Sequence, residues 1–159
     1  MSDIEVRIVT LPAMRVICFN GFGSSPEGMA YTKAEAWLKA NGDWENYKAH
    51  RFYGYNNPNP SPGSPNYGYD VWITVDESVQ ADEGSRIIDF PGGLYAVTSV
   101  HASPTGEGIY EAWQELAAWV ENSQYKDEYS SRQCLEESPD PFLGSPDGFT
   151  LNLFAPIRS

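Results

Sequence analysis

The first half of the chain alternates short β-rich runs with one helical segment. Residues 6–19 are rich in β-branched positions and are interrupted at Pro12, which predicts one strand with a kink or bulge. Residues 28–42 space their apolar positions like a helix and end at an Asn-Gly pair. Two further runs, 49–55 and 67–75, flank a proline-rich loop through which neither can continue. The pattern predicts the order strand, helix, strand, strand.

The second half follows the same plan. Strand-like runs lie near 86–90 and 94–100, a helical pattern covers about 107–121, and β-rich runs return at 132–137 and 149–155. Strands and helices in this proportion predict an α+β fold.

Direct sequence matches between the halves indicate a tandem duplication. RIVTLPAMRVICF from Arg7 lies over RIIDFPGGLYAVT from Arg86, an offset of 79 residues, and RFYGYNNPNPSPGSPN from Arg51 lies over RQCLEESPDPFLGSPD from Arg132, an offset of 81. We therefore expect one domain over 1–159, with repeat one at 1–76 and repeat two at 85–159. The acidic stretch between them is expected to act as a hinge.

Each repeat has one helix, which can cover only one face of its strands. Two such units bury most apolar surface by pairing, so we expect antiparallel sheets related by a pseudo-twofold axis, with a central cleft as the ligand site.

The composition of the chain indicates which classes of binding partner and which location to expect. The formal charge of −12 repels phosphate backbones and attracts cations, which disfavours direct nucleic-acid binding. No apolar run reaches the roughly 18 to 20 residues that span a bilayer, so no membrane partner is expected. Cys18 and Cys134 lie in apolar stretches, and no basic-then-apolar leader opens the chain, which favours reduced thiols and a cytoplasmic location. Nothing in the sequence indicates an oligomeric state.

Glu136 is the leading candidate for a functional carboxylate. Alternation in RQCLEES puts it on one face with Arg132 and Cys134, and the 81-residue offset pairs it with Tyr55 of the other repeat. An aromatic ring beside a carboxylate suits a cation site. The alternative, a solvated strand residue, stays open.

Aromatic residues supply the other candidates. In YGYDVWITV the odd spacing puts Tyr69 and Trp72 on opposite faces of the strand. In the second helical segment, Tyr110 and Trp113 are three residues apart and share one face. His50 and His101 lie in no metal-ligand spacing, and no phosphate fingerprint or catalytic triad is present, so neither a metal nor a cofactor is expected. The predicted ligand-binding residues are Tyr55, Tyr69, Trp72, Tyr110, Trp113, Glu136 and Phe154.

The order of several segments resembles a known family. PGGLYAVTSVHAS at 91–103, IYEAWQELAAWV at 109–120, LEES at 135–138 and LNLFAPI at 151–157 together resemble the GyrI-like small-molecule-binding family, related to effector-binding domains of AraC-type and MerR-type regulators. The resemblance implies paired repeats around an aromatic pocket whose acid, by its place in LEES, is Glu136. Ser138 stands where that family commonly has an aromatic residue. No helix-turn-helix precedes the segment, so a stand-alone binder is expected, with any regulation exerted through a partner chain.

Three functions remain open at this stage. The first is a stand-alone protein that binds a small hydrophobic, cationic or planar drug-like molecule. The second, implied by some members of the resembled family, is a hydrolase that opens strained cyclopropane rings of DNA-alkylating natural products, with Glu136 as its catalytic residue. The third is a protein-interaction inhibitor module that docks through its acidic surface.

Overall fold

The computed structural model describes residues 4–142 and 146–159, which belong to two compact units. Unit 1 combines Met1–Ala13 with Pro91–Ser159, and unit 2 is Met14–Phe90. The predicted α+β class is confirmed, and the described strand pairings are antiparallel. None of the described helices is both long and apolar enough to cross a membrane.

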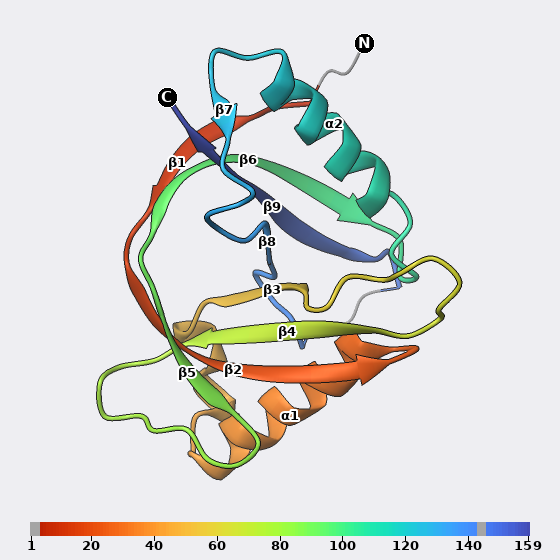
Figure 1. The fold of residues 1–159 in the computed structure, drawn as a ribbon. Helices are drawn as coiled ribbons and strands as arrows, with labels where there is room; N and C mark the ends of the chain where they lie inside the picture. The colour runs from red at the N-terminus through yellow and green to blue at the C-terminus, as the bar shows by residue number, and fades with distance from the viewer. Residues whose placement is uncertain (1–3, 143–145) are drawn as a thin grey trace. The chain divides into compact units, whose positions relative to one another are not determined.

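Unit 2 places its strands in the order β3, β4, β2, β5 (Figure 1). The bounds of its elements are β2 (Met14–Gly23), α1 (Pro26–Ala40), the short 3-10 helix η1 (Trp44–Ala49), β3 (Phe52–Asn56), β4 (Tyr67–Thr74) and β5 (Arg86–Phe90).

Helix α1 covers one face of the unit 2 strands. Its apolar stripe of Ala30, Ala34 and Leu38 is fully buried, and Trp37 contacts the ring of Phe19 on β2 with centroids 6.1 Å apart. Gly21 allows the close approach, because a Cβ there would collide with the backbone oxygen of Pro26. The face of β2 that carries Phe19 and Gly21 is therefore the helix side.

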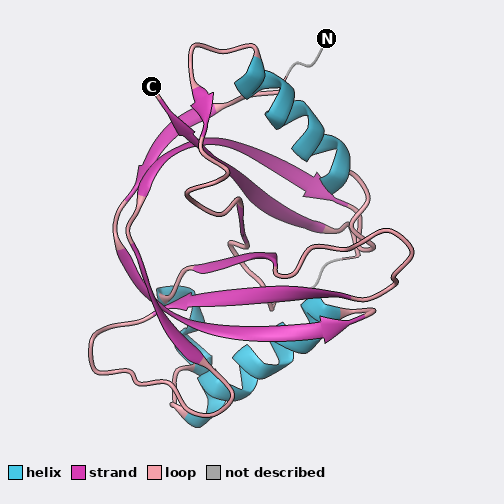
Figure 2. Cartoon of the chain, viewed as in Figure 1, coloured by secondary structure: helices cyan, strands magenta, loops and turns pink. Residues whose placement is uncertain are grey.

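Unit 1 places its strands in the order β1, β6, β9, β8, with the short β7 also paired to β9. The bounds are β1 (Arg7–Leu11), β6 (Gly93–Ala102), α2 (Ile109–Glu121), β7 (Lys126–Asp127), β8 (Leu135–Glu137) and β9 (Phe149–Arg158). Helix α2 lies over these strands (Figure 2) and buries Leu116 and Val120 against Ala96, Leu153 and Ile157.

The prediction of one kinked first strand is wrong. Pro12 separates β1 from β2, and the two strands belong to different units. β1 pairs with β6, with Arg7 opposite Val97, whereas β5 pairs with β2, with Arg86 opposite Cys18. The strand that opens each sequence repeat thus pairs with a strand of the other repeat. The acidic stretch 76–85 joins β4 to β5 inside unit 2, so it is not the connection between the compact units.

Candidate functional site

The strands of unit 2 carry a polar and aromatic surface on the face opposite α1, which we call the helix-free face of unit 2. Residues opposite one another in an antiparallel ladder share a face, and Cys18 lies on the side of β2 away from Phe19 and Gly21. Following the ladder from Cys18 gives members of this face that include Cys18, Asn20, Tyr53, Tyr55, Asp70, Trp72 and Arg86.

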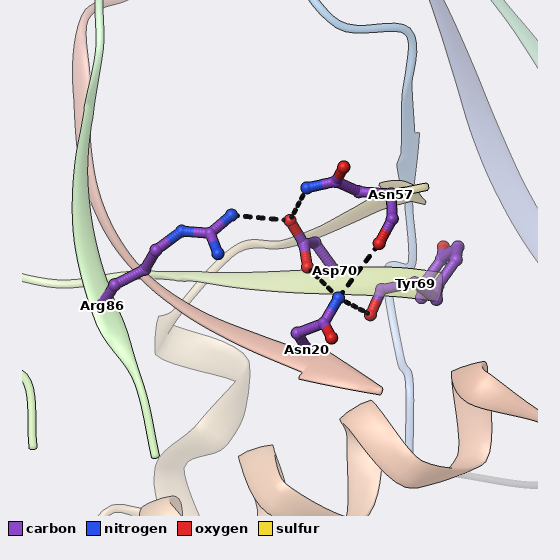
Figure 3. Close-up of polar contacts among 5 residues, drawn as sticks. All are labelled: Asn20, Asn57, Tyr69, Asp70 and Arg86. Atoms are coloured by element: carbon purple, nitrogen blue, oxygen red, sulfur yellow. Dashed lines mark hydrogen bonds and ion pairs between the residues drawn. The ribbon is translucent and has the colours of Figure 1, made fainter. Parts of the chain in front are cut away.

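Asp70 is the centre of this face. Its side chain has no exposed surface, yet Nη2 of Arg86 lies 2.8 Å from Oδ2 as an ion pair. The amides of Asn20 and Asn57 donate to Oδ1 and Oδ2 at 2.7 and 2.9 Å. Figure 3 shows the guanidinium and the two amides converging on the carboxylate. Burial of a carboxylate is tolerated here because paired and hydrogen-bonded donors replace its hydration.

Two further groups, the Cys18 thiol and the Tyr55 hydroxyl, donate hydrogen bonds to Asp70. Burial, then the Asp70 charge, raises the pKa of the Cys18 thiol from 9.0 to about 12. The same two causes, in the same order, raise the pKa of Tyr55 from 10.0 to about 12. Both groups are hydrogen-bonded to Asp70 and keep their protons at neutral pH. The carboxylate therefore has five donors around it.

Trp72 lies among aromatic rings on the same face. Its ring is fully buried, with Tyr55 edge-on at 5.4 Å and Phe90 tilted at 5.4 Å between centroids. Its indole Nε1 is buried without a hydrogen-bond partner among the described residues. Cys18 lies directly opposite Trp72 in the ladder, and the indole acts to lower the pKa of that thiol, but the pair does not meet hydrogen-bond geometry.

The ladders correct the repeat register by one residue. Arg7 and Arg86 are equivalent, and they lie opposite Val97 and Cys18, which in turn lie opposite Phe154 and Trp72. Phe154 is therefore the equivalent of Trp72, at an offset of 82 residues. Because Tyr55 lies opposite Asp70 and Glu137 lies opposite Asn152, Tyr55 corresponds to Glu137 and not to Glu136. A shift of one residue moves a side chain to the other face.

The face of the unit 1 strands opposite α2, which we call the helix-free face of unit 1, repeats the polar arrangement with different groups. Nη1 of Arg7 donates to Oγ of Ser99 at 3.3 Å, Ser99 donates to Oδ1 of Asn152 at 2.6 Å, and Nδ2 of Asn152 donates to Oε1 of Glu137 at 3.0 Å. The amide of Asn152 stands where unit 2 has Asp70. The acid has thus moved to the next strand, where Glu137 is half-buried.

Aromatic side chains also lie on the helix-free face of unit 1. Phe154 and Tyr95 meet edge to face with centroids 5.8 Å apart. Arg132 lies over the Tyr95 ring at 5.0 Å, while its guanidinium donates to the backbone oxygens of Leu94 and Ile157. Burial raises the pKa of Tyr95 to about 12, against the opposing effect of Arg132.

Glu136 lies on the other face, under α2. It is opposite Leu153, which belongs to the core beneath the helix, and its Oε2 accepts a 3.0 Å hydrogen bond from Nε1 of Trp113. Burial, then Glu136, then Asp127, raises the pKa of Cys134 to about 11. The predicted alternation of Glu136 and Leu135 across β8 is present in the ladder.

The predicted ligand-binding residues therefore fall into separate groups. Tyr55 and Trp72 meet on the helix-free face of unit 2, Phe154 occupies that of unit 1, and Trp113 meets Glu136 under α2. Two of the seven join none of these groups: Tyr69 is buried on the α1 side, beside Gly54, and Tyr110 is 68% exposed.

The sequence interpretation missed the residues that hold these faces together. One signal was available: Asp70 interrupts the apolar run YGYDVWITV, and a charge inside a buried strand requires partners. The missed residues are Asn20, Asn57, Asp70, Arg86, Glu137 and Asn152. Within the described ranges no three His, Cys, Asp or Glu side chains gather as metal ligands.

Comparison with known proteins assigns the class. Residues 7–157 match the family model of the integron-associated effector binding protein, Cass2, so the class is that of small-molecule-binding effector proteins. The chain belongs to this family, and the resemblance to GyrI-like proteins predicted from sequence is confirmed. No curated protein sequence matches the chain.

Solved structures share the fold at low sequence identity. EcmrR in complex with DNA is 10% identical with a TM-score of 0.70 over 98% of this chain, which spans 57% of the EcmrR chain. A hydrolase from Listeria innocua is 12% identical with a TM-score of 0.67, covering 99% and 94% of the two chains. SAV2435 bound to tetraphenylphosphonium is 11% identical with a TM-score of 0.58, covering 98% and 95%.

Proposed function

We propose that this effector-binding chain binds hydrophobic molecules that are cationic or planar, and that aromatic rings and a half-buried carboxylate recognise them. The observation that carries the proposal is the pair of neighbouring glutamates on β8. Glu136 is hydrogen-bonded to Trp113, and Glu137 lies on the same face as Phe154. A partly desolvated carboxylate beside aromatic rings attracts a lipophilic cation through charge and through the ring faces.

Glu137 is the stronger of the two candidates for the ligand acid. It lies on the helix-free face of unit 1, where Phe154 and Tyr95 supply aromatic surface, and it takes the ladder position of Tyr55. Glu136 lies under α2 with Trp113, as a second candidate. Asp70 is a weaker candidate than either, because Arg86 already neutralises it.

Among the aromatic residues, we propose Tyr55, Trp72 and Phe154 as ligand contacts. All three lie on helix-free faces, where no helix of their own unit covers them. Trp113 acts with Glu136 if that acid is the one used. Tyr69 supports the sheet from the α1 side, and Tyr110 remains open to a ligand only at the surface.

Calorimetric titration with tetraphenylphosphonium tests the proposal and separates the two acids. We expect micromolar binding by the unaltered chain and a loss of about tenfold in Glu137→Gln, since roughly 1.4 kcal/mol of charge attraction is removed. Glu136→Gln is expected to change the dissociation constant less than threefold. The matched control is Glu121→Gln, which removes the same charge at the exposed end of α2.

The titration distinguishes a wrong ligand class from a wrongly assigned acid. Absence of binding in the unaltered chain overturns the ligand class. Equal weakening in Glu137→Gln and Glu121→Gln shows that only net charge matters and overturns the assigned acid. A loss confined to Glu136→Gln transfers the role to the Glu136–Trp113 pair.

The charge and the cysteines of the chain support two further proposals, on its partners and its location. The formal charge of −12 supports a ligand other than nucleic acid, and the free cysteines among the described residues, Cys18 and Cys134, support a cytoplasmic location. Hydrolysis is not the function proposed, because the structural likenesses to hydrolases are 12% and 13% identical and indicate the fold alone.

A further inference from the structure

The indole N–H of Trp72 is an unusual group to find buried on a strand. Trp72 is 0% exposed, and its Nε1 has no hydrogen-bond acceptor in the part of the chain that the structure describes. A buried donor left unsatisfied costs about 1–3 kcal/mol. Buried indoles usually find a partner, so an unpartnered one calls for an explanation.

The neighbouring carboxylate cannot serve as that partner. Asp70 offers about four lone-pair sites, and Asn20, Asn57, Arg86, Cys18 and Tyr55 already donate to it. The Cys18 sulfur, opposite Trp72, is a weak acceptor and keeps its own proton. The indole also contacts the rings of Tyr55 and Phe90, which offer no acceptor atom in the plane of the indole N–H group.

The duplication provides an internal comparison. The ladder equivalent of Trp72 in unit 1 is Phe154, which is also buried and has no N–H group. An apolar ring therefore satisfies the packing at this position, and the indole nitrogen of Trp72 adds something that packing does not require.

We propose that Nε1 of Trp72 is the hydrogen-bond donor for a neutral acceptor group, such as a carbonyl or phosphoryl oxygen, on an aromatic ligand. The inference rests on the proposed small-molecule function and adds a second chemical requirement on the ligand. An anionic acceptor would add a buried charge without a counter-ion, because Arg86 is already paired with Asp70, and a cationic centre has no lone pair for the indole. The rings of Tyr55 and Phe90, which contact the indole with centroids 5.4 Å away, supply aromatic surface next to this donor.

Two neutral probes of the same shape test this assignment. Triphenylphosphine oxide carries a strong acceptor oxygen, and triphenylphosphine sulfide replaces it with a poor one. We expect the unaltered chain to bind the oxide more tightly, and Trp72→Phe to weaken the oxide about five- to tenfold, the worth of one hydrogen bond. The sulfide is expected to change less than twofold.

A spectroscopic measurement on the unaltered chain covers the case in which Trp72→Phe does not fold. The indole N–H signals of the 15N-labelled protein, assigned by triple-resonance NMR, report each of the five tryptophans. We expect the Trp72 indole proton to move downfield on saturation with the oxide and not with the sulfide. An unmoved Trp72 signal, or equal weakening of both probes in Trp72→Phe, overturns the inference.

Tetraphenylphosphonium, which has no acceptor, separates the two proposals. If tetraphenylphosphonium binds but the Trp72 indole signal does not shift with triphenylphosphine oxide, the cation proposal stands and the Trp72 inference fails. If it does not bind while the oxide moves the Trp72 signal, the cationic ligand class fails and the Trp72 inference holds. If the chain binds neither tetraphenylphosphonium nor triphenylphosphine oxide, both the cation proposal and the Trp72 inference are overturned.

Discussion

Nη2 of Arg86 lies 2.8 Å from Oδ2 of Asp70, and this ion pair ties β5 to β4 through a carboxylate that has no exposed surface. Its ladder equivalent, Arg7, instead reaches the hydroxyl of Ser99 at the surface of unit 1. The same position in the duplicated plan thus has two different energetic roles.

Removal of the guanidinium is expected to destabilise the protein at Arg86 of unit 2 but not at Arg7 of unit 1. We expect Arg86→Ala to lower the free energy of unfolding by about 2 kcal/mol, a value reduced from that of a fully buried pair because Arg86 is half exposed. Arg7→Ala, the matched control, is expected to cost less than about 0.5 kcal/mol. Urea unfolding followed by tryptophan fluorescence measures both. Equal losses would contradict the distinction.

The Cys18 thiol is expected to be unreactive in the folded chain. With its pKa raised to about 12, roughly one molecule in 10⁴ carries the thiolate at pH 8. Titration with Ellman's reagent is expected to label Cys18 at least a hundredfold more slowly in buffer than in urea. Rapid labelling of both cysteines in buffer would show that the thiol is not shielded.

The same shift predicts a loss of stability at high pH. Unfolded Cys18 ionises near pH 9.0 whereas folded Cys18 keeps its proton until about 12, so the folded state binds more protons in this range. The stabilisation is complete below pH 9 and is lost as the pH rises toward 12. Unfolding free energies measured from pH 8 to 11 are expected to fall less steeply in Cys18→Ala; parallel curves would rule out this contribution.

Two glycines are expected to respond to alanine in opposite directions. Gly92 has a φ of +80°, and a Cβ there would collide with the backbone of Leu11 and Pro12, so Gly92→Ala is expected to cost about 2 kcal/mol or more. Gly28 lies in α1 with open space around it, so Gly28→Ala is expected to stabilise by about 0.5 kcal/mol. Thermal unfolding distinguishes the two, and a neutral Gly92→Ala would contradict the tight crossing of the chain at that point.

The Trp113–Glu136 hydrogen bond is expected to show up as coupling between its two residues. A double-mutant cycle of Trp113→Phe and Glu136→Ala is expected to give about 1.5 kcal/mol, typical of a bond to a partly buried charge. Additive losses would indicate that the indole and the carboxylate act independently in solution.

The sequence predicted the class, the helices and the duplication well, because turn residues and apolar periods are local signals. Helix α2 was expected over about 107–121 and spans Ile109–Glu121. The strands that pair with β1 and β5 could not be predicted, because β1 and β5 have the same apolar pattern and either fits β2 or β6 equally. Only the ladders show that Arg7 lies opposite Val97 and Arg86 opposite Cys18.

The candidate site was predicted less completely. Matching of the proline-rich loops gave an offset of 81, whereas the strands beside them follow 82, and this single residue exchanges Glu136 for Glu137 on the helix-free face. Loop matches tolerate insertions, but strand register does not. Asn152 shows the same limit, because its role depends on Ser99 and Glu137 from two other strands.

The exchange of opening strands has a consequence for how the protein is made on the ribosome. Unit 2 is one continuous stretch, Met14–Phe90, whereas unit 1 needs β1 and β6, which are separated by the whole of unit 2. At about 5–20 residues per second, β1 waits roughly 4–16 s after its own synthesis before its partner begins to emerge. Unit 2 can therefore complete its ladders during translation, and the first strand of the polypeptide is among the last to find its neighbour.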